Sequence, residues 1–486
     1  MQVFNDPDEE SPDRMLHDLI VPILLGYLIV GVLLIGIFRG IPGVMLTVIL
    51  GCLFLPPAQG INLPGLPMYT KEYAVSYALL LGIMLTDPSR LTRFRLSLFD
   101  LPVIIWICTP FFSSVTNGLG AYDGLSSVYS QFFVYGVPYF VGRVYIRTPN
   151  DIRDIAKWFV IAGLIASPFV LWESRMSPQL NMDLYGYRVS GFQAAKRLGG
   201  YRPMLFMRHG LEVGLWMSTS AVVAFWFLLT NHRTVRLFKY ALTAPSGIVL
   251  FATLMCRSLG ALVLLFGTAG AATTTRHFGV RLALIALVLT PSVYLGVRIT
   301  NFWSPDDLTA IVASFDEQRA DSLEARLNQE LFISEHALEK PIFGWGGHDR
   351  YRPINDEGDV EPVDGWTSIT LGKNGLVGLI SLQCFTTLPA FFLLRRLKPV
   401  RLTDPIWAPC IGVLLACSIF ALDILFNAFP APLHLLGIGT LTTTAIYAPR
   451  WQHMIRSHTL RNVQVPPEQI DQGHSPSQPP PRLSAS

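Results

Sequence analysis

Charge is scarce in this chain. Charged residues make up 15% of its 486 positions, whereas apolar residues make up 51%, a balance too apolar for an ordinary soluble protein. The formal net charge is only +3, so the protein lacks the strongly basic field that attracts nucleic acid. The composition therefore predicts a membrane protein with no nucleic-acid partner.

Cysteine is equally sparse. The six cysteines stand at positions 52, 108, 256, 384, 410 and 417, all in or at the ends of apolar segments, and their spacing fits no metal site. We therefore expect neither disulfides nor a bound metal, and nothing in the sequence calls for a cofactor. The acidic N-terminus also lacks the basic region that opens a signal peptide, so no cleaved signal is predicted.

Long apolar segments are what the chain does have. A membrane-spanning helix needs about 20 apolar residues, and at that length only helices satisfy their own backbone in lipid. Since two of the segments are short, we predict an all-α polytopic membrane protein with about 12–13 transmembrane helices. The predicted spans cover 19–38, 41–55, 70–86, 100–116, 128–146, 156–172, 210–230, 239–256, 259–273, 281–299, 367–394, 405–426 and 432–448.

The short basic connections predict the orientation, because lysine and arginine collect on the cytoplasmic side. Basic connections occur near residues 90–95, 147–157, 233–239, 276–281 and 395–401, and after 449. Their alternation places 117–127, 173–209, 301–366 and 427–431 outside. The side of the N-terminus depends on whether twelve or thirteen spans form.

The same pattern predicts four regions. Residues 1–300 are expected to form an N-terminal transmembrane bundle of about ten helices, with the external loop 173–209. Residues 301–366 form a large extracytoplasmic loop, and 367–448 the C-terminal transmembrane helices. Residues 449–486 are expected to be a disordered cytoplasmic tail, because their end is rich in proline, glutamine and serine.

The charged stretch from Asp321 to Gly378 interrupts the apolar sequence and is the predicted working part. Asp321 and Glu324 resemble a capping box that begins an amphipathic helix, and Pro341 ends it. The apolar face of this helix is predicted to contain Leu323, Leu327, Leu331, Ile333 and Leu338.

Four features of this stretch occur in a recognisable order: Arg326, then Pro341-Ile-Phe-Gly-Trp-Gly346, then Asp364, then Asn374-Gly-Leu-Val-Gly378. The order resembles the O-antigen ligase and polysaccharide polymerase superfamily of bacterial envelopes, which reads Arg, a helix, Pro-x-x-Gly-x-Gly, His-Asn and x-Gly-x-x-Gly. Asp364 stands where the ligases carry histidine, and relatives with aspartate there are more polymerase-like. The resemblance covers roughly residues 190–395.

The resemblance implies a membrane glycosyltransferase on the outer face of the bacterial inner membrane. Its donor would be a glycan on undecaprenyl diphosphate and its acceptor a sugar hydroxyl, on another lipid-linked glycan in a polymerase or on a lipid core in a ligase. Membrane lipid and other polysaccharide assembly proteins are the remaining expected partners.

The candidate catalytic residues are Asp364, Arg326 and Arg257. Asp364 could take the proton of the acceptor hydroxyl, or it is a loop aspartate before a turn glycine. Arg326 and Arg257 could hold a diphosphate by bidentate bonds. Alternatively, Arg326 forms a surface pair with Glu330, and Arg257 snorkels at a helix end.

Four further residues are candidates for substrate binding: Arg208, His209, Lys373 and His336. Arg208 belongs to a set of cations in loop 173–209, which either binds an anionic substrate or meets lipid headgroups. Lys373 could reach headgroups or the diphosphate. His336 could bind substrate, or it is an ordinary histidine on the face of a helix. The cations of this loop are Arg175, Arg188, Lys196, Arg197, Arg202 and Arg208.

Two other function classes remain open. A transporter or flippase of lipid-linked glycan would place ionisable groups near the bilayer midplane and often shows inverted repeats. Here the charges gather at the outer ends of the spans and in one long loop, which favours the enzyme. A non-catalytic glycan-binding relative is the third possibility, because aspartate replaces histidine at position 364.

Overall fold

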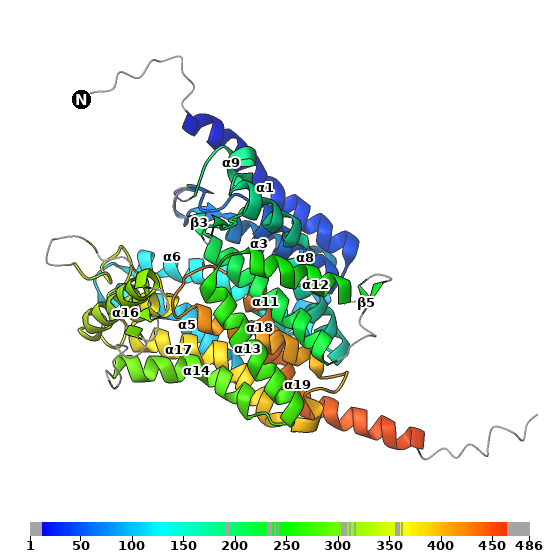
Figure 1. Cartoon of the computed structure of the whole chain (residues 1–486). Helices are drawn as coiled ribbons and strands as arrows, with labels where there is room; N and C mark the ends of the chain where they lie inside the picture. The colour runs from blue at the N-terminus through cyan, green and yellow to red at the C-terminus, as the bar shows by residue number, and fades with distance from the viewer. Residues whose placement is uncertain are drawn as a thin grey trace, which may run out of the picture. The chain divides into compact units, whose positions relative to one another are not determined.

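The structure, a computed structural model, is described for most of the chain. The described residues are 12–189, 195–197, 199–230, 236–237, 240–241, 243–300, 302, 309–310, 313–314, 317–354, 360 and 363–463. They fall into two compact units, Met1–Ile446 and Tyr447–Ser486. Helices dominate the described residues (Figure 1), so the predicted all-α fold is confirmed.

A helix lies in each of the predicted spans, but the predicted span 239–256 begins differently: Tyr240–Ala241 is a strand, and the helix starts at Thr243. Among the described residues, apart from the 3₁₀ turns η1 (Leu98–Asp100) and η3 (Pro399–Arg401), the helical elements are α1 (Pro12–Phe38), α2 (Ile41–Phe54), α3 (Lys71–Thr86), α4 (Pro88–Thr92), α5 (Leu101–Thr116), α6 (Ala121–Gln131), the π-helical turn η2 (Phe132–Gly136), α7 (Val137–Tyr145), α8 (Pro149–Met176), α9 (Leu180–Tyr185), α11 (Gly210–Leu229), α12 (Thr243–Met255), α13 (Leu259–Phe278), α14 (Leu282–Ile299), α16 (Glu317–Leu338), α17 (Trp366–Arg396), α18 (Ala408–Asp423) and α19 (Pro432–Val463).

The strands of the described residues form three small antiparallel hairpins: β1 (Gly60–Ile61) with β2 (Tyr69–Thr70), β3 (Lys196–Arg197) with β4 (Gly200–Tyr201), and β5 (Arg236–Leu237) with β6 (Tyr240–Ala241).

Length and composition confirm the membrane class. Within the described part of the chain, six helices are long and apolar enough to cross a bilayer: Leu19–Phe38, Leu98–Thr116, Pro149–Met176, Gly210–Leu229, Leu282–Ile299 and Trp366–Arg396. Ile41–Phe54, Ala244–Met255 and Ala408–Asp423 are shorter apolar helices. The total of about 12–13 spans stays a prediction.

Helices α11 and α18 form the buried centre of the first unit. In α11, 15 of 20 residues are buried, and in α18, 15 of 16; α11 packs against α8, α12, α13 and α18. Helix α17 packs against α5, α14 and α16. This arrangement brings the charged stretch after residue 320 against helices from distant parts of the sequence.

Two expectations about the charged stretch and the tail were wrong in detail. Helix α16 begins at Glu317, not at Asp321, and its buried face carries Leu327, Glu330, Ile333 and Ala337, whereas Leu338 is 40% exposed. Leu327 and Ile333 are buried as predicted, and the side chain of Leu323 lies outside the described residues. At the other end, α19 continues to Val463, so 449–463 is helical. The rest of the predicted tail lies outside the described residues.

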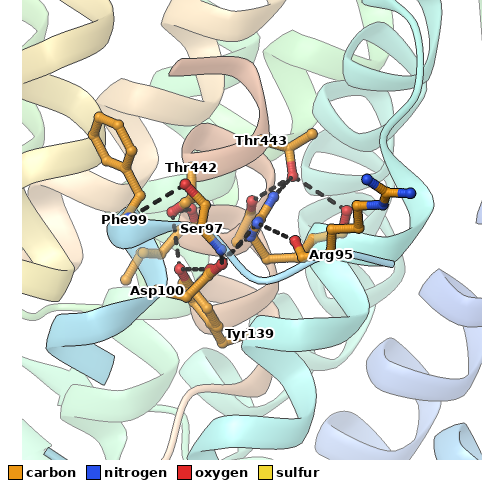
Figure 2. A network of polar contacts seen from close by, with 10 residues as sticks. Arg95, Ser97, Phe99, Asp100, Tyr139, Thr442 and Thr443 are labelled. Atoms are coloured by element: carbon orange, nitrogen blue, oxygen red, sulfur yellow. Dashed lines mark hydrogen bonds and ion pairs between the residues drawn. The ribbon is translucent and has the colours of Figure 1, made fainter. Parts of the chain in front are cut away.

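A buried ion pair joins α7 to the start of α5. Arg143 donates from Nε and Nη2 to the two carboxylate oxygens of Asp100, at 2.6 and 2.8 Å, and Tyr139 also donates to Asp100, at 2.8 Å. Arg143 Nη1 donates to Thr443 Oγ1 of α19 at 3.0 Å. Figure 2 shows how this network connects the three elements.

Arg143→Met should lower the free energy of unfolding by about 3–5 kcal/mol, because it leaves the Asp100 charge buried without its partner. Unfolding in mixed micelles by a denaturing detergent measures the change. Adding Asp100→Asn should recover a large part of the loss. Arg90→Met is the control, since its pair with Asp87 is partly exposed and should contribute only ~0–1 kcal/mol. Equal losses for both variants would contradict the assignment.

Candidate functional site

Helix α17 is interrupted, and the loop after α16 fills the interruption. The backbone leaves helical geometry at Gly375 (φ 63°, ψ −164°). The Leu376 N–H donates to the Pro341 carbonyl at 2.7 Å, and the Trp345 N–H donates to the Gly372 carbonyl at 2.8 Å. The loop 341–346 therefore satisfies backbone groups that a break in a helix would otherwise leave unpaired.

Glycine is required on both sides of this contact. Both Gly344 (φ 69°) and Gly375 have left-handed backbones. A Cβ atom on Gly344 would lie 2.6 Å from the Gly372 carbonyl oxygen, and one on Gly375 would lie 2.4 Å from the Ile342 carbonyl oxygen. Only glycine combines this conformation with so close an approach. The two glycine motifs of the sequence thus form one structural unit.

The first half of α17 is also held at its N-terminal end. The Trp366 N–H donates to the Asn427 carbonyl and the Thr367 N–H to the Ile424 carbonyl, both at 3.2 Å. These two carbonyl groups belong to residues that follow α18. The free N–H groups at the start of α17 therefore bond to carbonyl groups just after the end of α18. The contact fixes the position of Asp364, which lies two residues before α17.

Arg326 and Asp364 line the same pocket. This Arg326–Asp364 pocket is small, with a cavity volume of about 20 Å³, and lies between α16, the start of α17 and the end of α18. Asp364 is exposed, and Arg326 is half-buried. Arg326 also interacts electrostatically with Asp423, whose carboxylate accepts a 2.8 Å hydrogen bond from Asn427. The lining residues are Arg326, Gln329, Glu330, Ile333, Val363, Asp364, Gly365, Ser368, Leu425 and Phe426.

Glu330 is a second carboxylate in this pocket. It turns toward α14 instead of forming the surface pair with Arg326: Tyr294 donates to Glu330 Oε2 at 2.6 Å, and Arg298 Nε lies 3.7 Å from the same oxygen. Burial raises the pKa of Glu330, although Tyr294 and Arg298 act in the opposite direction. Its bonds to α14 give Glu330 a structural role, which leaves Asp364 as the accessible carboxylate.

Arg257 lies in the short turn between α12 and α13. It has a left-handed backbone (φ 50°), which is strained for a residue with a side chain. Its guanidinium lies directly against Gly200 of β4, where an added Cβ would be 2.2 Å from Nη1. Among the described residues, Arg257 does not line the Arg326–Asp364 pocket. The structure therefore places it against the β3–β4 hairpin, away from its predicted partners in that pocket.

Arg208 and His209 organise the start of α11. Arg208 Nη2 lies 2.9 Å from Glu72 Oε1, and the Arg208 N–H donates to Glu212 at 2.9 Å. His209 is the N-cap residue: its Nδ1 accepts a hydrogen bond from the Leu211 N–H at 3.2 Å. Nearby carboxylates raise the pKa of Arg208 against the opposing effect of burial. Capping explains His209 without a substrate.

The cations of loop 173–209 are not equivalent. Arg202 is buried, Arg175 is exposed, and Arg208 is paired with Glu72. They therefore do not all face one surface, as a bowl for an anionic substrate would require.

Sequence reasoning missed Lys71 and Glu72, which begin α3. Both are only 4% exposed. Lys71 Nζ donates to the Phe206 carbonyl at 3.0 Å, and Glu72 holds Arg208. The available signal was two adjacent charges inside a predicted span, because ionisable residues there are costly and face protein or a cavity.

His336 and Lys373 take different positions. The His336 ring stacks on Trp345 with centroids 4.4 Å apart, and its Nε2 lies 3.1 Å from the Arg350 carbonyl oxygen. His336 thus packs against the loop that fills the break in α17. Lys373 lies over the Tyr351 ring, with Nζ 4.8 Å from the centroid, and lines a second, larger cavity.

Comparison with known proteins gives no assignment: no protein-family model matches the chain, and no curated protein matches it.

Proposed function

We propose that this protein is a glycosyltransferase of the bacterial inner membrane, which transfers or polymerises an undecaprenyl-diphosphate-linked glycan on the periplasmic side. The observation that carries the proposal is that Arg326 and Asp364 line the same pocket. They come from two separate parts of the predicted motif, and they combine a diphosphate-binding cation with an accessible carboxylate.

The proposed reaction is an in-line displacement at the anomeric carbon of the donor. The acceptor hydroxyl oxygen forms a bond to that carbon, while the bond from the carbon to the diphosphate oxygen breaks. Asp364 takes the proton of the acceptor hydroxyl, and Arg326 stabilises the negative charge on the leaving diphosphate. The chemistry parallels inverting glycoside hydrolysis, with a sugar hydroxyl in place of water. The products are an extended or ligated glycan and undecaprenyl diphosphate.

The direct test uses purified protein in lipid nanodiscs. The donor is the lipid-linked glycan that accumulates in cells lacking the protein. We expect release of undecaprenyl diphosphate and a product whose new linkage has inverted anomeric configuration. Movement of intact lipid-linked glycan across liposomes, without release of the diphosphate, would instead identify a flippase and overturn the proposal.

The proposed side of the site predicts a labelling pattern. Cysteines introduced as Ser314→Cys and Gln179→Cys should react with an impermeant maleimide once the outer membrane is permeabilised, because both positions are exposed and lie in loops predicted to be outside. Arg93→Cys, in a basic connection, should react only after the inner membrane is lysed. The unmodified chain controls for its own cysteines. The reverse pattern would refute the orientation.

A further inference from the structure

The larger cavity lies between α5, the α6–η2 segment and the first half of α17. Its volume is about 330 Å³, and hydroxyl, amide and aromatic groups dominate its lining. Most of its polar lining comes from serines, Gln131, Tyr135, Thr370, Lys373 and Asn374. Among the described lining residues, Lys373 is the one charged residue.

A π-helical turn shapes one wall. Residues Phe132–Gly136 are π-helical between α6 and α7, and such turns occur frequently at functional sites. This turn places Tyr135 in the lining and follows directly on Gln131. Tyr135 stacks on Trp366 with centroids 4.7 Å apart, and Trp106 holds Trp366 edge-on at 5.4 Å. The aromatic part of the wall is therefore fixed before any ligand binds.

Polar groups of the wall are shielded from bulk solvent. Asn374 is 5% exposed and Thr370 is 3% exposed, and both residues line the cavity. The side-chain oxygen Oε1 of Gln131 is buried and has no hydrogen-bond partner within the described part of the chain. Buried polar groups are normally paired, so these groups point to a ligand with several hydroxyl groups.

Lys373 adds a charge preference. Its ammonium lies against the Tyr351 ring, 4.8 Å from the centroid. Two charged residues outside the lining interact with this ammonium group: Asp349 attracts it and Arg352 repels it. A single cation in an otherwise uncharged, partly enclosed cavity favours one anionic group on the ligand.

We propose that this cavity binds a saccharide that carries a carboxylate, with Lys373 as the residue that selects the acidic sugar. The inference rests on the proposed glycan transfer for the identification of the ligand as part of the substrate glycan. Residues of the first half of α17 line both cavities: Ser368 faces the Arg326–Asp364 pocket, and Thr370 and Lys373 face this one. A glycan held here lies beside the helix that Asp364 precedes.

Saturation-transfer NMR with the protein in neutral phosphatidylcholine nanodiscs tests the proposal. The probes are glucuronate, glucose and glycerol 1-phosphate. We expect glucuronate to bind at least about tenfold more tightly than glucose, because a charge-assisted bond is lost with glucose. Binding of glycerol 1-phosphate as tight as that of glucuronate would identify a phosphate or headgroup site and overturn the proposal, as would equal binding of the two sugars or no binding of glucuronate.

Variants connect the binding to the named residues. Lys373→Gln should remove the preference for glucuronate. Lys340→Gln is the matched control and should keep it, because Lys340 also lies over an aromatic ring, that of Trp345, but outside this cavity. Ser127→Trp should abolish binding of both sugars by filling the cavity from α6. Unchanged glucuronate binding in folded Lys373→Gln or Ser127→Trp protein would overturn the proposal.

Asp364→Asn separates this inference from the proposed function. The variant should bind glucuronate normally, since Asp364 does not line this cavity. Lys373-dependent binding without any glycan transfer would mean that the cavity is assigned correctly and the transfer reaction is wrong. Transfer without Lys373-dependent binding would mean that the transfer reaction is assigned correctly and the cavity is not.

Discussion

Asp364→Asn should lower glycan transfer by at least about 100-fold, with membrane insertion unchanged. Asparagine keeps the size and hydrogen bonding of aspartate but cannot accept the proton of the acceptor hydroxyl, and loss of a general base costs about 10²–10⁴ in rate. The rate is measured as release of undecaprenyl diphosphate by purified protein. Asp364 is exposed and outside the regular helices, so the substitution should leave stability within about 0.5 kcal/mol.

Glu330→Gln is the matched control, because it changes the other carboxylate of the same pocket. It should retain transfer to within a few-fold at equal amounts of folded protein. Asp364→His restores the residue of the ligases and can also accept a proton, although its greater length changes the position of the acceptor. Near-normal transfer by Asp364→Asn would make Asp364 a turn residue, and loss in Glu330→Gln alone would assign the base to Glu330.

Arg326→Ala should lower transfer by roughly ten- to a hundredfold. A charge-assisted hydrogen bond contributes ~1.5–3 kcal/mol, and a loss of this size in the transition state lowers the rate accordingly. Arg326→Lys should recover only part of the rate, because an ammonium group keeps the charge but not the bidentate geometry. The assay is again release of undecaprenyl diphosphate by purified protein.

Two other arginines serve as comparisons. Arg175→Ala should lose little, because Arg175 is exposed at the end of α8. Arg257→Ala tests whether the strained turn between α12 and α13 acts on the reaction or only holds the β3–β4 hairpin. Equal, mild losses in all three alanine variants would mean a diffuse cationic surface and would refute a defined diphosphate site at Arg326.

The positions of the helices could be predicted from the sequence because they depend on local properties. A helix in lipid must satisfy its own backbone, so apolar length alone marks where each one lies. The predicted segment 367–394, for example, became α17 (Trp366–Arg396). Gly344 and Gly375 were also selected from the sequence, but only as members of the two motifs that carry the resemblance. The sequence did not show that these two glycines meet.

Contacts between distant residues were decided by the tertiary structure. The sequence paired Arg326 with Glu330 by their spacing on one helix, but Tyr294 and Arg298 of α14 offer Glu330 a buried partner. A buried, hydrogen-bonded pair outweighs an exposed i, i+4 pair of a few tenths of a kcal/mol. Arg208 likewise forms an ion pair with Glu72, which belongs to a helix far earlier in the chain.

The candidate site shows the same division. The sequence by itself determined which residue types lie between the apolar segments, and it selected Arg326 and Asp364. Only the tertiary structure decided that these two share a pocket while Arg257 lies against Gly200. The physical reason is that a pocket consists of side chains from several helices, and no local pattern specifies how those helices pack against one another.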